Sequence, residues 1–277
     1  MRAEDEEFDT MTTEEMTADS GTAHPNPEET HFGRMLAAEA EAGARVAYGN
    51  LPDQFFEWFG DPHTAGTVVV LIHGGYFRER TTLAHARPMA HALVKRGERA
   101  DRGVAVALIE YRRAGGAGGH PRTLEDVETA IAHIAEAVDG AGVVIAGHSA
   151  GGSLTLSWAT RQSEAGPQVR VRPLAPVTDL VAEARDALGD GAVVDYMGAS
   201  PADDLSRYLA EDPRSRAALI PARLDVRLIH GTEDATVDIA FSRGFPAARL
   251  ELEGADHFDL VDPHSPHFDT VVSALLD

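Results

Sequence analysis

The sequence has 277 residues and no cysteine; 43% of its residues are hydrophobic, 25% are charged, and the formal net charge is −21. This size and composition are typical of one globular domain with a sizeable core. Without cysteine there are no disulfides, thiolate metal ligands or cysteine nucleophiles. The acidic excess argues against nucleic acid or a membrane as partner, because both attract basic patches. No apolar run is long enough for a membrane span or a targeting signal, so we expect a cytoplasmic protein.

The first 30 residues are unusually acidic. They hold ten aspartates or glutamates against Arg2 alone, a net charge of −9. A segment with so much charge and so few large apolar residues does not bury enough surface to fold by itself. The sequence therefore predicts an acidic, disordered leader over residues 1–31 and one folded catalytic domain over residues 32–277.

Apolar runs predict the strands of a buried sheet. Five of them are rich in aliphatic and β-branched residues, which is typical of strands buried on both faces of a parallel sheet. They lie at residues 67–72, 103–109, 142–146, 169–174 and 224–229. One further strand is expected on each side of this set, at residues 53–59 and 249–252.

Helical patterns separate these strands. The expected helices span residues 82–96, 123–138, 153–160 and 266–276. Pro88 predicts a kink or restart in the first helix, and Thr123 is the predicted N-cap of the second. Strands alternating with helices predict an α/β fold, a doubly wound, mostly parallel sheet with helices on both faces. Residues 178–222 fit neither period and are expected to form a small, cap-like helical insertion over the carboxyl edge of the sheet.

One glycine-rich segment carries a candidate nucleophile. Gly147-His148-Ser149-Ala150-Gly151-Gly152 lies between a predicted strand and a predicted helix. A strand, a sharp turn and a helix form the nucleophile elbow, which lifts a serine hydroxyl above a sheet. The alternatives are an idle serine in a glycine-rich turn and a phosphate-binding loop, but the Gly-Lys-Ser/Thr of a phosphate loop is missing. Ser149 is therefore the predicted nucleophile.

A second glycine-rich segment, His73-Gly74-Gly75-Tyr76, follows an earlier predicted strand. Enzymes with a serine elbow take one oxyanion donor from the residue after the serine, here the N–H of Ala150. Their other donors come from the loop after an earlier strand, which points to Gly75 and Tyr76. A plain glycine turn is the alternative. His73 is expected to orient this loop rather than to act as a base.

The catalytic base has to be chosen among 13 histidines. Enzymes with a serine elbow carry serine, acid and histidine in that order along the chain. His257 follows the last predicted strand near the C-terminus, so it is the predicted base. His264 and His267 lie just beyond it and are the nearest alternatives.

The triad acid is expected after the penultimate strand, where it would accept the imidazole N–H and fix the tautomer. That position offers Glu233 and Asp234. Asp179, after the strand before it, is the alternative. Two carboxylates beside the predicted base, Asp256 and Asp259, are interpreted as loop caps.

From about Val46 to its C-terminus, the chain resembles the α/β-hydrolase superfamily, in particular the esterase/lipase branch that includes kynurenine formamidases (arylformamidases). Its anchors are Tyr48 to Phe55, His73-Gly74-Gly75-Tyr76, Glu110-Tyr111-Arg112-Arg113, Gly147-His148-Ser149-Ala150-Gly151-Gly152, His230-Gly231-Thr232-Glu233-Asp234 and Gly254-Ala255-Asp256-His257-Phe258-Asp259. The resemblance implies an α/β-hydrolase fold, with Asp234 as the triad acid and His257 as its histidine. Phe77 stands where the formamidase branch usually carries tryptophan.

These features together predict a serine hydrolase that cleaves a small carboxylic ester or aryl formamide through an acyl-enzyme. Tyr76, Phe77 and His148 are the candidate substrate-binding residues. Neither a cofactor nor a metal is expected. The alternatives are a small-peptide or amide hydrolase of the prolyl-oligopeptidase type, for whose large additional domain the chain has no room, and a non-catalytic ligand-binding protein of the same fold. A homodimer is left open.

Overall fold

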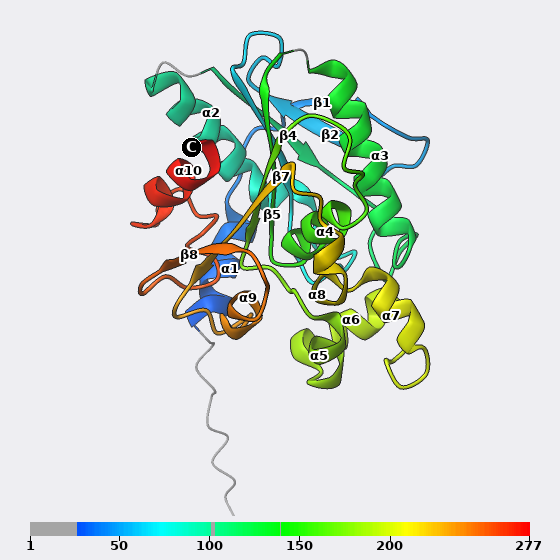
Figure 1. The fold of residues 1–277 in the computed structure, drawn as a ribbon. Coiled ribbons are helices and arrows are strands. Elements are labelled where there is room, and N and C mark those ends of the chain that lie inside the picture. The colour runs from blue at the N-terminus through cyan, green and yellow to red at the C-terminus, as the bar shows by residue number, and fades with distance from the viewer. Residues whose placement is uncertain (1–26, 101–102, 139) are drawn as a thin grey trace, which may run out of the picture.

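The computed structural model describes residues 27–100, 103–138 and 140–277. At its centre lies an eight-stranded sheet in the order β1-β2-β4-β3-β5-β6-β7-β8 (Figure 1). The strands are β1 (Ala44–Ala47), β2 (Phe55–Phe59), β3 (Thr67–Ile72), β4 (Val104–Ile109), β5 (Gly142–His148), β6 (Val169–Leu174), β7 (Leu224–Gly231) and β8 (Ala248–Leu252). The β1–β2 and β2–β4 pairs are antiparallel, and all other neighbours are parallel. The predicted mostly parallel sheet is confirmed.

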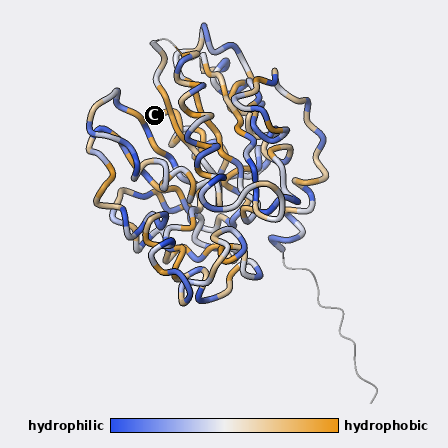
Figure 2. Tube along the Cα trace, turned by 90° about the vertical axis from the view of Figure 1, so that its right-hand side faces the viewer, coloured by the Kyte–Doolittle hydropathy of each residue, from blue (hydrophilic) through white to orange (hydrophobic). Residues whose placement is uncertain are grey.

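Helices cover both faces of the sheet (Figure 1). One face carries α2 (Arg87–Arg99) and α10 (Phe268–Leu276), and the other carries α3 (Arg122–Ala137) and α4 (Ala150–Ala159). The aliphatic run of β3 supplies both cores, because successive side chains of a strand point to opposite faces. Val68 and Val70 pack in the core with α3 and α4, whereas Val69 and Leu71 pack in the core with α2 and α10. Hydrophobic residues accordingly gather along the central strands (Figure 2).

The two predicted helix starts differ in outcome. A short 3-10 helix, η1 (Leu83–Ala86), ends where α2 begins, and Pro88 lies in the first turn of α2, so the predicted restart is confirmed. Proline fits a first turn because its missing N–H has no intrahelical acceptor there. Thr123 as an N-cap is wrong, since α3 begins one residue earlier. Its hydroxyl instead donates to the carbonyl of Arg112 and accepts from the N–H of Gly119, which ties a loop to the helix.

Residues 178–222 consist mostly of short helices at one end of the sheet (Figure 1). They are α5 (Leu180–Arg185), α6 (Leu188–Met197), α7 (Leu205–Glu211), α8 (Pro213–Arg216) and η2 (Ala217–Leu219). A further short helix, α9 (Ala240–Arg243), follows β7. Asp179 is the N-cap of α5, and its carboxylate accepts a hydrogen bond from the N–H of Ala182.

The N-terminal end of the described chain differs from the expectation for the leader. Helix α1 (Pro27–Ala37) begins before the predicted boundary at residue 31, and residues 1–26 lie outside the described residues. Two of its polar side chains are buried, Glu28 at 4% and His31 at 6% exposure. Within the described ranges, no helix combines the length and apolarity that crossing a membrane requires.

Candidate active site

Ser149 lies at the tip of a sharp turn between β5 and α4. Its backbone has φ 55° and ψ −120°, a conformation that side-chain-bearing residues rarely adopt and that concentrates at functional sites. The hydroxyl-bearing residue is 6% exposed. The strand, turn and helix that the sequence predicted around this serine are therefore present, with the serine in a strained backbone conformation.

Glycines make this turn possible. A Cβ on Gly147 would lie 2.3 Å from the carbonyl oxygen of Gly151, and a Cβ on Gly151 would lie 2.2 Å from that of Ile72. Both distances are far below van der Waals contact, so larger residues would push α4 away from β5 and β3. The parallel register, in which Ile72 pairs with Gly147, sets this close approach.

Asp234 and His257 are in direct contact. The Nδ1 of His257 lies 2.7 Å from Oδ2 of Asp234, although 23 residues separate them along the chain. The other oxygen, Oδ1, accepts from the N–H groups of Thr236 (3.0 Å) and Val237 (2.7 Å). Burial by itself raises the pKa of Asp234, but His257 and these hydrogen bonds hold it well below its ordinary value. The carboxylate is therefore charged and fixed, as a group that orients an imidazole needs to be.

The neighbour of Ser149, His148, lies behind the predicted base. Its Nε2 donates to the carbonyl oxygen of His257 (2.9 Å), and the centroids of the two rings are 4.5 Å apart. Burial and the nearby His257 keep the pKa of His148 well below its ordinary value. His148 does not line the pocket beside Ser149, so its contact is with the base rather than with a substrate bound there. Within the described residues no hydrogen bond joins the hydroxyl of Ser149 to His257; such contacts are often long before substrate binds.

The predicted oxyanion loop passes close to the serine. A Cβ on Gly74 would lie 3.1 Å from the Cβ of Ser149, so this backbone is packed against the elbow. Gly75 and Tyr76 follow with positive φ values of 115° and 57°. Ala150 is the first residue of α4, where an N–H has no intrahelical acceptor. The three predicted donors thus lie on the two segments that meet at Ser149.

A buried network holds the oxyanion loop in place. The Nε2 of His73 bonds Oε1 of Glu110 (2.9 Å), and its Nδ1 bonds the carbonyl oxygen of Gly74 (2.7 Å). The hydroxyl of Tyr111 donates to the carbonyl oxygen of His73 (2.7 Å). Burial, followed by the nearby charge of Arg113, lowers the pKa of His73 to about 3. His73 orients the loop, as expected, and is too shielded to serve as a base.

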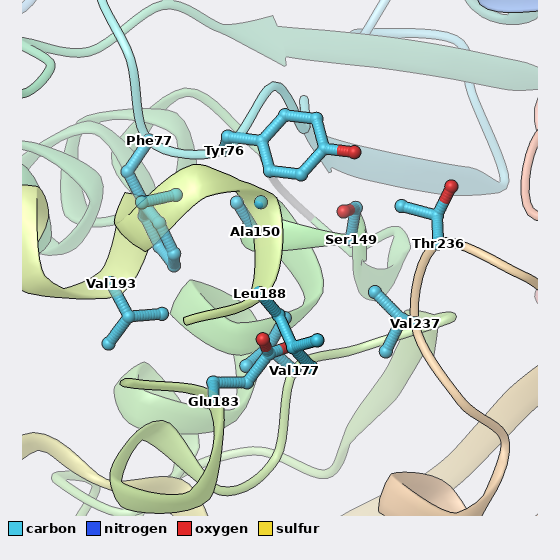
Figure 3. A pocket seen from close by; sticks show the side chains of 12 residues that line it. Tyr76, Phe77, Ser149, Ala150, Val177, Glu183, Leu188, Val193, Thr236 and Val237 are labelled. Atoms are coloured by element: carbon cyan, nitrogen blue, oxygen red, sulfur yellow. The ribbon is translucent and has the colours of Figure 1, made fainter. Parts of the chain in front are cut away.

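A pocket with an empty volume of about 320 Å³ opens beside Ser149 (Figure 3). Tyr76 and Phe77 form one side, and Thr236 and Val237 form another. The remaining side comes from residues 177–193, which include Val177, Glu183, Leu188 and Val193. Of the predicted substrate-binding residues, Tyr76 and Phe77 line this pocket.

The alternative acids and bases lie elsewhere. The carboxylate of Asp179 caps α5 and lies 3.7 Å from Arg214, without contact to His257. Asp256 caps its own loop by accepting from the N–H groups of Phe258 and Asp259, as interpreted from the sequence. His264 and His267 lie in the segment that leads into α10, and neither bonds Asp234.

The structure adds two residues that the sequence reasoning missed. His230 is fully buried, and its Nε2 lies 3.1 Å from Oδ2 of Asp234 and 2.9 Å from the carbonyl oxygen of Val237. The sequence feature that could have indicated His230 was its position directly after a predicted strand. Glu28 lies in the segment assigned to the leader, yet its carboxylate reaches the loops that carry Asp234 and His257. A proline followed by two glutamates is typical of a helix start and could have indicated α1.

Glu28 accepts three hydrogen bonds from those loops. Its Oε1 accepts from the N–H of Ala235 (2.9 Å) and from the N–H of His257 (3.2 Å). Its Oε2 accepts from the hydroxyl of Thr236 (2.6 Å). One carboxylate therefore bridges the segment after the predicted acid and the backbone of the predicted base.

His31, one turn further along α1, joins two acidic residues near the base. Its Nδ1 lies 2.9 Å from Asp256 and its Nε2 lies 3.0 Å from Asp262. His31, Asp256 and Asp259 also place ligand atoms within 4.8 Å of one another, the arrangement in the described chain that most resembles a metal site. Both ring nitrogens of His31 are already engaged by carboxylates, so the arrangement is explained as an ion-paired histidine.

The fold has relatives among solved structures. A putative thioesterase from Silicibacter sp. TM1040 is 20% identical, with a TM-score of 0.66 over 94% of this chain and 96% of that chain. Esterase B from Lactobacillus rhamnosis is 18% identical, with a TM-score of 0.67 over 90% and 91% of the two chains. A carbohydrate esterase from gut microbiota is 19% identical, with a TM-score of 0.62 over 79% and 90%. At these identities the similarity establishes the α/β-hydrolase fold that the motifs predicted.

No curated protein matches the chain. A family model, BD-FAE, matches residues 61–248, which include the serine elbow, the oxyanion loop and Asp234. The match covers well over half of the chain and agrees with the fold of the solved relatives. The chain therefore belongs to the BD-FAE family of α/β-hydrolase-like esterases.

Proposed function

We propose that this protein is a serine hydrolase of small carboxylic esters, with Ser149, His257 and Asp234 as its triad. The contact between Asp234 and His257, at the same sheet edge as the strained serine, is the observation that carries the proposal. Family membership and the esterases among the solved relatives support the reaction type. The proposed reaction needs no cofactor.

The reaction proceeds by acyl transfer. His257 takes the proton of the Ser149 hydroxyl as its oxygen attacks the ester carbonyl, and Asp234 stabilises the imidazolium that forms. The N–H groups of Ala150, Gly75 and Tyr76 are the proposed donors to the oxyanion. His257 then protonates the leaving alcohol, which leaves an acyl-Ser149. Water, deprotonated by the same imidazole, releases the carboxylic acid and restores the serine.

The pocket favours esters over formamides. Its apolar side chains from the insertion, among them Leu188 and Val193, line a narrow space that a short acyl chain would enter. A formyl group has no carbon beyond its carbonyl and would leave these side chains without contact. Apolar burial contributes about 0.8 kcal/mol per CH₂, so a short acyl chain gains affinity that a formyl group lacks.

The direct test compares p-nitrophenyl acetate, p-nitrophenyl butyrate, N-formylkynurenine and a proline-containing dipeptide amide as substrates. We expect both esters to be hydrolysed, butyrate with the higher kcat/KM, and Ser149→Ala to abolish turnover and fluorophosphonate labelling. Ser153→Ala is the matched control on the same helix, and its activity should equal that of the wild type. Turnover that survives in Ser149→Ala would contradict the proposal, and faster turnover of the formamide than of the esters would reassign the substrate.

A further inference from the structure

Glu183 places a carboxylate in the wall of the same pocket. It comes from α5 and is 4% exposed, and Figure 3 shows its side chain beside Leu188 and Val177, below Ser149. Among the described residues that line the pocket, it is the only charged one. Its backbone N–H donates to Asp179, but its carboxylate has no hydrogen bond to any described residue.

A largely buried carboxylate without a partner is unfavourable, because partial removal from water costs free energy that no hydrogen bond offsets. The pKa of this carboxyl group is shifted accordingly. Burial first, and then the negative charges of Asp186 and Asp179, raise the pKa of Glu183 to about 7. A positively charged hydrogen-bond donor in the pocket would satisfy the carboxylate and relieve the repulsion from both aspartates.

The proposed nucleophile and this carboxylate lie in the wall of the same pocket. Ser149 and Glu183 line the same pocket, so an acyl chain attached to Ser149 would extend among Leu188, Val193 and Val237. Among the described residues, no lysine, arginine or histidine lines the pocket to neutralise Glu183 or to attract an anionic group. The apolar side chains favour binding of a short hydrocarbon chain, and the Glu183 carboxylate favours a particular functional group on that chain.

We propose that Glu183 determines specificity by binding a substrate ammonium group, so that the preferred substrates are small esters whose acyl chain bears a cationic amine. This inference rests on Ser149 being the nucleophile, since that assignment places the acyl chain in the pocket. A neutral hydroxyl gains one hydrogen bond without the charge attraction, and a carboxylate is repelled. The kcat/KM is therefore expected to be highest for esters whose acyl chain ends in an ammonium group, lower for those ending in a hydroxyl or methyl group, and lowest for those ending in a carboxylate.

The experiment uses p-nitrophenyl esters at pH 8, where a group with a pKa of about 7 is mostly ionised. Propanoate is compared with 3-aminopropanoate, and hexanoate with 6-amino-hexanoate, 6-hydroxy-hexanoate and the adipate monoester. For at least one chain length, we expect the ester whose acyl chain ends in an ammonium group to have a kcat/KM about tenfold higher than the ester whose chain ends in a methyl group. Tenfold is the effect of one charged hydrogen bond. Glu183→Gln, which keeps the shape, should reduce that ratio to about one.

Asp186→Asn is the matched control, because it removes a nearby negative charge without altering the lining of the pocket. It should keep the ammonium preference. A wild type with no ammonium preference at either chain length, or with a larger preference for the hydroxyl ester, would overturn the inference. So would a preference that persists in Glu183→Gln.

Binding of n-butylammonium and of butanol to Ser149→Ala, measured by calorimetry, tests the same inference without turnover. The cation should bind at least about tenfold more tightly than the alcohol, and Glu183→Gln should remove the difference. The two proposals fail in different ways. Hydrolysis of plain esters that depends on Ser149 but shows no ammonium preference overturns only the Glu183 subsite, whereas absence of Ser149-dependent hydrolysis overturns the proposed function.

Discussion

Two segments outside the sheet border the candidate active site, and their polar side chains contact different parts of the molecule. Helix α1 is joined to the loops around Asp234 and His257 by two buried polar side chains, Glu28 and His31. The segment of residues 178–222 lines the pocket with apolar side chains and with the carboxylate of Glu183. Its buried Glu211 bonds His120 and Arg161. Its ion pair with Arg78, two residues after Tyr76, leaves the Asp195 side chain 57% exposed.

This difference separates two tasks. Buried hydrogen bonds to a charged group are directional and strong, so α1 constrains where the backbone of the proposed base lies. Exposed ion pairs contribute little and are screened by salt. Neither Glu211 nor Asp195 bonds Asp234 or His257, so the segment of residues 178–222 shapes the substrate pocket without holding the triad. Substitutions in the two regions should therefore have different kinetic signatures.

The largest contrast is expected between two aspartates: Asp234, in a loop that α1 contacts, and Asp179, in the segment of residues 178–222. Asp234→Asn removes the acceptor of the His257 N–H and should reduce kcat about 10⁴-fold, because the imidazole loses its tautomer and its countercharge. Asp179→Asn should leave kcat within about threefold, because asparagine caps a helix as well as aspartate does. Both values come from steady-state kinetics on p-nitrophenyl butyrate. The reverse order would move the triad acid to Asp179.

The next largest effect is expected at Glu28, whose hydrogen bonds join α1 to the backbone of the proposed base. Glu28→Ala removes the acceptor of three hydrogen bonds and should lower kcat about tenfold to a hundredfold, with KM little changed, because small misplacements of a catalytic group cost that much. Glu28→Gln should be intermediate. Glu29→Ala, an exposed neighbour on the same helix, is the control. A fall in melting temperature with unchanged kcat in the folded variant would show that Glu28 is structural only.

His31 gives α1 a pH-dependent attachment. Burial lowers the pKa of His31, but Asp256 and Asp262 raise it more, so its folded pKa lies above the ordinary value of 6.5. A raised pKa stabilises the fold fully below pH 6.5, and this contribution is lost as the pH rises through the folded pKa. His31→Asn should therefore destabilise the protein more at pH 5.5 than at pH 8.5, by on the order of 1 kcal/mol in urea unfolding. The exposed His264→Asn should show no such difference between the two pH values.

The smallest effect is expected at the exposed ion pair. Arg78→Gln removes the contacts of this guanidinium with Asp195 and with the carbonyl oxygen of Asp190. The free energy of unfolding should fall by about 0.2–1 kcal/mol, and 0.5 M NaCl should reduce the difference. The kcat on p-nitrophenyl acetate should stay at the wild-type value. A loss of kcat comparable to that of Glu28→Ala would erase the contrast between the two segments.

Parts of the molecule that depend on local pattern were predictable. The run from Thr67 to Ile72 is aliphatic throughout, because both faces of β3 are covered, and its bounds match the prediction. The elbow around Ser149 was predictable because its glycines are required by contacts within a few residues and with the adjacent strand. The choice of Asp234 over Asp179 came from a family resemblance, since both follow strands. The prediction of Thr123 as an N-cap was wrong because its hydroxyl bonds groups outside its own helix.

The amino-acid sequence by itself indicated seven of the strands, the helices between them and the turn that carries Ser149, and it supplied the candidate acids and bases for a triad. Only the tertiary structure decided what braces and surrounds them. Glu28 lies more than 200 residues from His257 along the chain, and Glu183 lies in a segment without clear periodicity. A carboxylate becomes a brace or a binding group through burial and the direction of its oxygens, and both properties are set by chain segments that meet only in the fold.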